Sequence, residues 1–67
     1  MGGNNMRDQI LKVLRESDHP MGVQEIAKVL NVKFPAIQVE IYNNNLGKQL
    51  NFISFQGSTK FSVKDNG

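Results

Sequence analysis

The middle of the chain reads Gln24-Glu25-Ile26-Ala27-Lys28-Val29-Leu30-Asn31-Val32, and this stretch decides the fold. Its apolar residues recur with helical spacing and predict a short amphipathic helix that buries one face. The positions on that face are Val23, Ile26, Ala27 and Leu30. Asn31 suits the left-handed conformation that ends a helix, and Val32 returns the chain to the core. The stretch therefore predicts a helix and a tight turn.

Helical patterns also lie on both sides of this stretch. The earlier one runs from about residue 6 to 17, with Asn5 as its predicted N-cap, and ends before Pro20 because residues preceding proline avoid the helical region. Its apolar stripe is formed by Met6, Ile10, Val13 and Leu14. The later helix is expected over about 35–46, with Pro35 in its first turn. Its expected core residues are Phe34, Ile37 and Ile41.

From Leu50 the apolar period changes from helical to alternating. Residues 50–55 and 60–63 are rich in aromatic and β-branched residues and predict two strands. The intervening residues 56–59 include Gly57 and predict the turn of a hairpin. The sequence thus predicts an α+β fold of three helices followed by a C-terminal β-hairpin.

The chain has 67 residues, which is enough for one domain. We expect a disordered segment over 1–5, the folded domain over 6–64 and a polar tail over 65–67. No cysteine is present, so disulfides and thiolate metal sites are excluded, and a reducing, cytoplasmic location is expected. The apolar runs are too short for a membrane span, and no membrane contact is predicted.

The stretch 24–32 resembles the first helix and turn of a helix-turn-helix unit, with its Ile26-Ala27 pair and the following Leu30-Asn31-Val32. Pro20 and Gly22 precede it, as a proline or glycine does in winged helices. From about Met6 to Val63 the chain is similar to the winged helix-turn-helix superfamily. The resemblance implies a three-helix core with the hairpin as its wing, and it implies binding of DNA, RNA or protein.

A narrower resemblance concerns the Z-alpha domains, winged helices that bind left-handed nucleic acid. Gln38 and Tyr42 stand where that family has an Asn and a Tyr, and Phe61-Ser62-Val63 is similar to its Trp-Ser-Ile. The wing lacks the family's prolines, and Phe34 and Pro35 replace its lysines. This resemblance adds one hypothesis to the two described below, namely structure-selective binding of left-handed nucleic acid through Gln38, Tyr42 and Phe61.

The first hypothesis is a DNA-binding module that acts as a transcriptional or replication regulator in the cytoplasm, at the nucleoid, or in a nucleus. Residues 33–64 carry four lysines and one glutamate, whereas the charges of residues 1–32 balance, and a basic half suits a polyanion. In such folds the third helix enters the major groove of duplex DNA and the wing contacts its backbone. The predicted DNA-binding residues are Lys33, Gln38, Tyr42, Asn43, Lys48, Ser58, Thr59, Lys60 and Lys64.

The second hypothesis is a protein partner or a homodimer. Helix three contains no lysine or arginine, and Glu40, expected on its exposed face, would repel a phosphate. An apolar stripe beside that face is typical of a protein interface. Its residues are Pro35, Val39, Tyr42 and Leu46.

No enzyme activity is predicted. His19 is the one histidine and has no partner at metal-ligand spacing, so no metal site is expected. The chain has no glycine-rich phosphate loop and no recognisable catalytic spacing. We therefore expect no cofactor and no small-molecule substrate.

Overall fold

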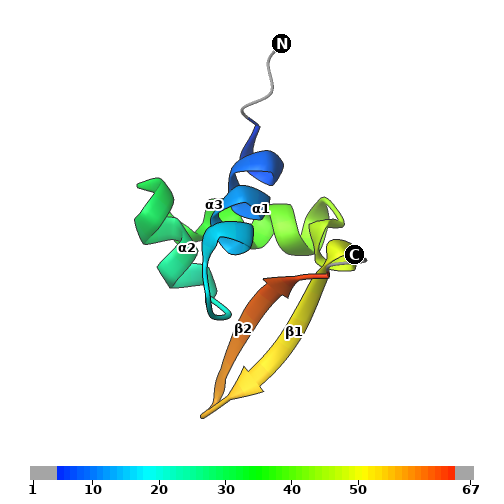
Figure 1. Ribbon diagram of the computed structural model, residues 1–67. Coiled ribbons are helices and arrows are strands. Elements are labelled where there is room, and N and C mark those ends of the chain that lie inside the picture. The colour runs from blue at the N-terminus through cyan, green and yellow to red at the C-terminus, as the bar shows by residue number, and fades with distance from the viewer. Residues whose placement is uncertain (1–4, 65–67) are drawn as a thin grey trace.

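The computed structural model describes residues 5–64 as three helices followed by an antiparallel β-hairpin, which confirms the predicted α+β order (Figure 1). The elements are α1 (Met6–Glu16), α2 (Val23–Leu30), α3 (Phe34–Gln38), β1 (Leu50–Phe55) and β2 (Ser58–Val63). A π-helical turn, η1 (Val39–Asn43), continues α3, and a 3₁₀ turn, η2 (Leu46–Gln49), leads into β1. This order is compatible with winged-helix topology. The predicted end segments, 1–4 and 65–67, lie outside the described residues.

The ends of α1 and α2 follow the predicted local chemistry. Asn5 is the N-cap of α1, and its Oδ1 accepts a hydrogen bond from the Asp8 N–H at 2.8 Å. Asn31 ends α2 with φ 60° and ψ 45°, in the left-handed region that asparagine tolerates. The Val32 N–H then donates to the Ala27 carbonyl at 3.0 Å, which closes the turn between α2 and α3.

The core lies between the three helices and the inner face of the hairpin. Its buried residues are Ile10, Leu11, Leu14, Met21, Ile26, Ala27, Ile37, Ile41, Leu46, Leu50 and Phe61. Every predicted helix contributes to it, and burial of these side chains stabilises so small a domain. Phe34 was expected in this core, but it is 45% exposed. Phe34 is the first residue of α3, and the buried part of this face begins one turn later, at Ile37.

The third helix ends differently from the prediction. The Asn44 N–H donates to the Val39 carbonyl at 3.1 Å, five residues back, so the last turn is wider than an α-helical turn. Asn45 then adopts φ 66° and reverses the chain into η2. The regular helix that was assumed in placing Leu46 on an exposed stripe therefore ends before this residue. Its side chain is fully buried, and its assignment to the partner-binding stripe is wrong.

The hairpin projects away from the helical body (Figure 1). Its register pairs Leu50 with Val63 and Phe55 with Ser58, so the turn consists of residues 56 and 57 alone. Gln56 and Gly57 both have positive φ, 50° and 81°, as the central residues of a type I′ turn require. The predicted turn over 56–59 was therefore too long, because a two-residue turn already matches the twist of the strands.

Met21 adds a short bridge to the other side of β2. Its N–H donates to the Phe61 carbonyl at 3.0 Å, and its carbonyl accepts from the Phe61 N–H at 2.8 Å. This pair anchors the hairpin to the loop between α1 and α2. An isolated two-stranded hairpin is marginal in water, so the bridge and the burial of Phe61 hold the hairpin in place.

Candidate nucleic-acid interface

A polar hollow of about 460 Å³ lies where α3, η1, β2 and the start of α2 meet. Five of the predicted DNA-binding residues line it: Gln38, Tyr42, Ser58, Thr59 and Lys60. The remaining lining residues are Gly22, Val23, Gln24, Glu25 and Phe61. The fold therefore brings the predicted helix-three and wing residues together around one concave surface, which we call the polar hollow.

The Lys60–Glu25 ion pair forms part of the wall of the polar hollow. Lys60 Nζ lies 2.8 Å from Glu25 Oε1, and the Gly22 N–H donates to the same oxygen at 3.0 Å. The hydrogen bond from Lys60, together with that from Gly22, holds the pKa of Glu25 below its usual range. The predicted wing lysine is thus already engaged by a carboxylate.

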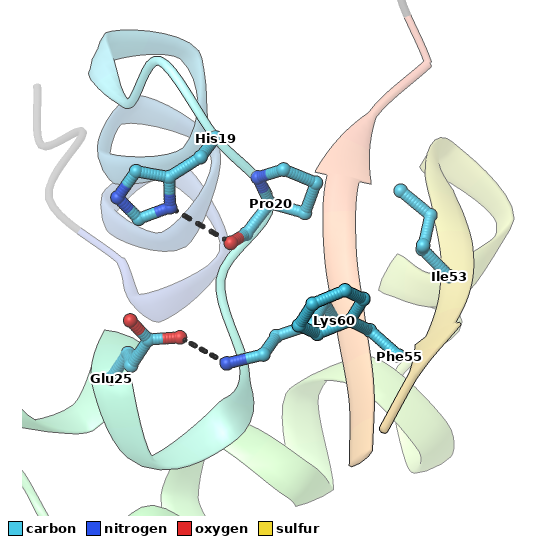
Figure 2. A pocket seen from close by; sticks show the side chains of 6 residues that line it. All are labelled: His19, Pro20, Glu25, Ile53, Phe55 and Lys60. Atoms are coloured by element: carbon cyan, nitrogen blue, oxygen red, sulfur yellow. Dashed lines mark hydrogen bonds and ion pairs between the residues drawn. The ribbon is translucent and has the colours of Figure 1, made fainter. Parts of the chain in front are cut away.

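An apolar groove of about 340 Å³ lies on the other side of this ion pair. Figure 2 shows its walls: Ile53 and Phe55 extend from β1, and Pro20 and His19 come from the loop after α1. The Pro20 carbonyl accepts a hydrogen bond from His19 Nδ1 at 2.9 Å, which fixes the imidazole beside the proline. The Lys60–Glu25 pair therefore separates a polar surface from an apolar one.

Three aromatic rings connect the polar hollow to the core. Phe61 is fully buried, and its ring meets Phe52 edge to face with centroids 5.0 Å apart. Phe52 in turn meets Tyr42 at 6.2 Å. Tyr42 thus packs on the hairpin and still leaves 54% of its surface exposed. Its phenol group can reach a ligand in the polar hollow while its ring remains supported.

The other predicted DNA-binding residues are exposed but lie outside the lining of the polar hollow. Lys33 is the N-cap of α3, Asn43 ends η1, Lys48 belongs to η2, and Lys64 follows β2. Within residues 5–64 none of these three lysines forms an ion pair. Their charges are therefore available to a polyanion at the surface.

Two expectations about helix three change in the structure. With Leu46 buried, the apolar stripe is reduced to Pro35, Val39 and Tyr42, all of which are exposed. Glu40 was expected on the exposed face, but its side chain is only 16% exposed. Asn44 Nδ2 donates a hydrogen bond to Glu40 Oε1 at 3.1 Å, and Arg7 Nε lies 3.8 Å from Glu40 Oε2. The negative charge of Glu40 is therefore partly compensated.

Sequence reasoning missed two residues of this surface. Glu25 was assigned no role, although its place three residues after the N-cap Gly22 is the position of the acid in a capping box. Phe52 was read only as a strand residue, yet it is half exposed and supports Tyr42. The first had a sequence signal, whereas the second depends on how the hairpin meets η1.

No helix within residues 5–64 has the length and apolar character needed to cross a bilayer. In the same range no three His, Cys, Asp or Glu side chains gather as ligands for a metal ion. Comparison of the chain with protein-family models, with curated proteins and with solved structures gives no match.

Proposed function

We propose that the protein is a DNA-binding winged-helix module that acts as a small transcriptional or replication regulator. In this proposal α3 and η1 approach the major groove of duplex DNA, and the hairpin is the wing that contacts its backbone. The observation that carries the proposal is the polar hollow, in which Gln38 and Tyr42 of the helix lie with Ser58, Thr59 and Lys60 of the wing.

The chemistry of these side chains suits both parts of such a contact. Ser58, Thr59 and the Tyr42 hydroxyl can donate to phosphate oxygens, and these contacts position a protein without reading sequence. The Gln38 amide can pair with the N6 and N7 atoms of adenine. Lys60 supplies a cation once a phosphate replaces Glu25 as its partner. The hollow therefore offers one base-reading group within a set of backbone-binding groups.

The modest charge of the interface limits its affinity. Lys60 is paired with Glu25, so the exposed lysines Lys33, Lys48 and Lys64 supply the remaining attraction to phosphates. Few phosphate contacts mean weak binding with a shallow dependence on salt. A single copy should thus bind a short duplex weakly, and its affinity should fall only gradually as salt rises.

The test is a titration of ¹⁵N-labelled protein with a generic duplex, followed by fluorescence anisotropy at several salt concentrations. The expected result is that backbone shifts move in residues 38–43 and 58–60. Replacing Lys33 and Lys60 together by alanine should weaken binding and reduce the salt slope by about two. The matched control, Lys12→Ala with Lys28→Ala, removes the same charge from α1 and α2.

Either of two results would refute the DNA proposal. One is the absence of shifts in helix three and the wing at saturating duplex. The other is an equal loss of affinity in the control double variant, because binding would then follow net charge and not the polar hollow.

Protein docking is the second candidate, and the exposure of Val39 (47%) and Tyr42 favours it. The burial of Leu46 shortens the stripe on which it was based. Val39→Glu should abolish such docking without unfolding the protein, and unchanged partner binding would exclude this surface. Left-handed nucleic acid has weaker support, because the wing residue expected to contact it, Phe61, is fully buried.

A further inference from the structure

One edge of the hairpin is open. The bonds between Met21 and Phe61 show that the main-chain groups of Phe61 point away from β1. Phe61 lies opposite Phe52, and in an antiparallel ladder the residues of such a pair both point their main-chain groups outward. By alternation the main-chain groups of Ser54 face the same outer side. Within residues 5–64 no hydrogen bond occupies this edge at Phe52 or Ser54.

The open edge lacks the features that prevent strand pairing. Proteins protect such edges with charged residues, proline or bulges. The stretch from Leu50 to Gly57 contains no charged residue and no proline, and its pairing with β2 is continuous. The Ile53 and Phe55 side chains are also exposed, by 37% and 57%. The edge therefore offers both unpaired main-chain groups and apolar surface.

We propose that β1 pairs with β1 of a second copy of this chain, antiparallel and centred on Ile53. In this register Phe52 of each copy exchanges hydrogen bonds with Ser54 of the other, so the free groups of both residues are satisfied. The two Ile53 side chains face each other across the two-fold axis, and each Phe55 lies diagonal to the opposite Ile53. The exposed apolar side chains of β1 thus cover one another.

Three features favour a second copy over the strand of another protein. An uncharged strand does not repel an identical one, and a two-fold contact needs only one self-complementary patch. Met21 already covers the far edge of β2 at Phe61, so in a pair of copies each outer edge of the combined sheet is covered at that residue. A foreign peptide would leave a new open edge. The hairpin also projects from the helices (Figure 1), so antiparallel copies place their helical bodies at opposite ends of the sheet.

Sedimentation equilibrium of the full chain tests this proposal, and we expect a monomer–dimer equilibrium. Ser54→Pro removes an N–H that faces the open edge and leaves the hairpin ladder intact. It should weaken dimerisation about tenfold or more, since one intermolecular hydrogen bond is lost per copy. The matched variant Ser54→Ala keeps the N–H and should dimerise normally. A chain that stays monomeric at millimolar concentration would overturn the proposal, as would equal dimerisation of both variants.

Disulfide trapping tests the register separately. The natural chain has no cysteine, so a single introduced cysteine can react only with its counterpart. Ile53→Cys should cross-link under mild oxidation, because facing residues of a non-hydrogen-bonded pair lie within disulfide range. Asn51→Cys, on the same face of the same strand, should not. Equal cross-linking of the two variants, or none in either, would refute this pairing, and strand capture by another protein would then be the remaining use of the edge.

Discussion

Lys60 Nζ and Glu25 Oε1 lie 2.8 Å apart, and this contact ties the hairpin to the first turn of α2. The same carboxylate oxygen accepts from the Gly22 N–H, which lies at the helix start and has no intrahelical partner. Glu25 therefore stabilises the start of α2 and holds the hairpin at once. A phosphate that binds Lys60 has to compete with a carboxylate that is already in place.

The competition at Lys60 gives the first prediction. Glu25→Gln removes the negative charge from the polar hollow and leaves an amide oxygen that can still accept from Gly22. Removing a unit charge about 6 Å from a phosphate in a water-like medium changes the binding energy by roughly 0.7 kcal/mol, or about threefold in affinity. We therefore expect Glu25→Gln to bind a duplex about threefold more tightly in fluorescence anisotropy.

Glu16→Gln is the control for this substitution. It makes the same change of charge in the last turn of α1, and Glu16 does not line the polar hollow. Its effect on affinity should be much smaller. If Glu25→Gln and Glu16→Gln increase the affinity for the duplex equally, the ion pair between Glu25 and Lys60 has no special part in binding.

Acid should destabilise the fold through the same carboxylate. The pKa of Glu25 is lower in the folded chain than its ordinary value of 4.5, so ionised Glu25 stabilises the fold above that value. This contribution disappears as the pH falls through the lower folded-state pKa. In urea titrations the free energy of unfolding should decrease less for Glu25→Gln than for the natural chain between neutral pH and about pH 3. Equal decreases would show that the pair does not contribute.

The helical pattern placed Val39 and Leu46 on the same exposed stripe, but in the structure Leu46 is buried and Val39 is exposed. Leu46→Ala should lower the free energy of unfolding by about 2–5 kcal/mol, because a large apolar side chain is deleted from the core. Val39→Ala should change it by about 0.5 kcal/mol or less, since Val39 is 47% exposed. Chemical denaturation followed by circular dichroism measures both. Similar losses in the two variants would contradict the buried position of Leu46.

A substitution at Gln56 in the hairpin turn should stabilise the fold. Gln56 has φ 50°, a conformation that favours Asn over Gln, and Asn-Gly is the preferred pair in type I′ turns. Gln56→Asn should therefore raise the free energy of unfolding by about 0.5 kcal/mol. Gln56→Ala should give no gain, since alanine has no such preference. A gain from alanine equal to that from asparagine would mean that backbone conformation is not the cause.

The helices were predictable because their signals are local. Asn5 caps α1 and Asn31 ends α2 through contacts within a few residues, and the apolar spacing of Ile26 and Ala27 fixes the buried face. The two strands were recognised for the same reason. The alternation of apolar and polar residues that begins with Leu50, Asn51 and Phe52 is visible in the sequence itself.

The rest depended on contacts between distant segments. A regular helix of 100° per residue placed Leu46 at the surface, and only the π turn and the left-handed Asn45 bring it into the core. The wing lysine was predicted, but its partner was not, since Glu25 and Lys60 are 35 residues apart. Grouping of the site residues was likewise implied by the family resemblance and not by any local pattern.

The half-exposed ring of Tyr42, supported by Phe52 at the rim of the polar hollow, has an optical consequence. The chain contains one tyrosine and no tryptophan, so all of its ultraviolet emission in the tyrosine band arises from this one position. Any molecule that enters the hollow changes the surroundings of that chromophore. The unlabelled protein therefore carries its own reporter of occupancy, placed where helix three meets the hairpin.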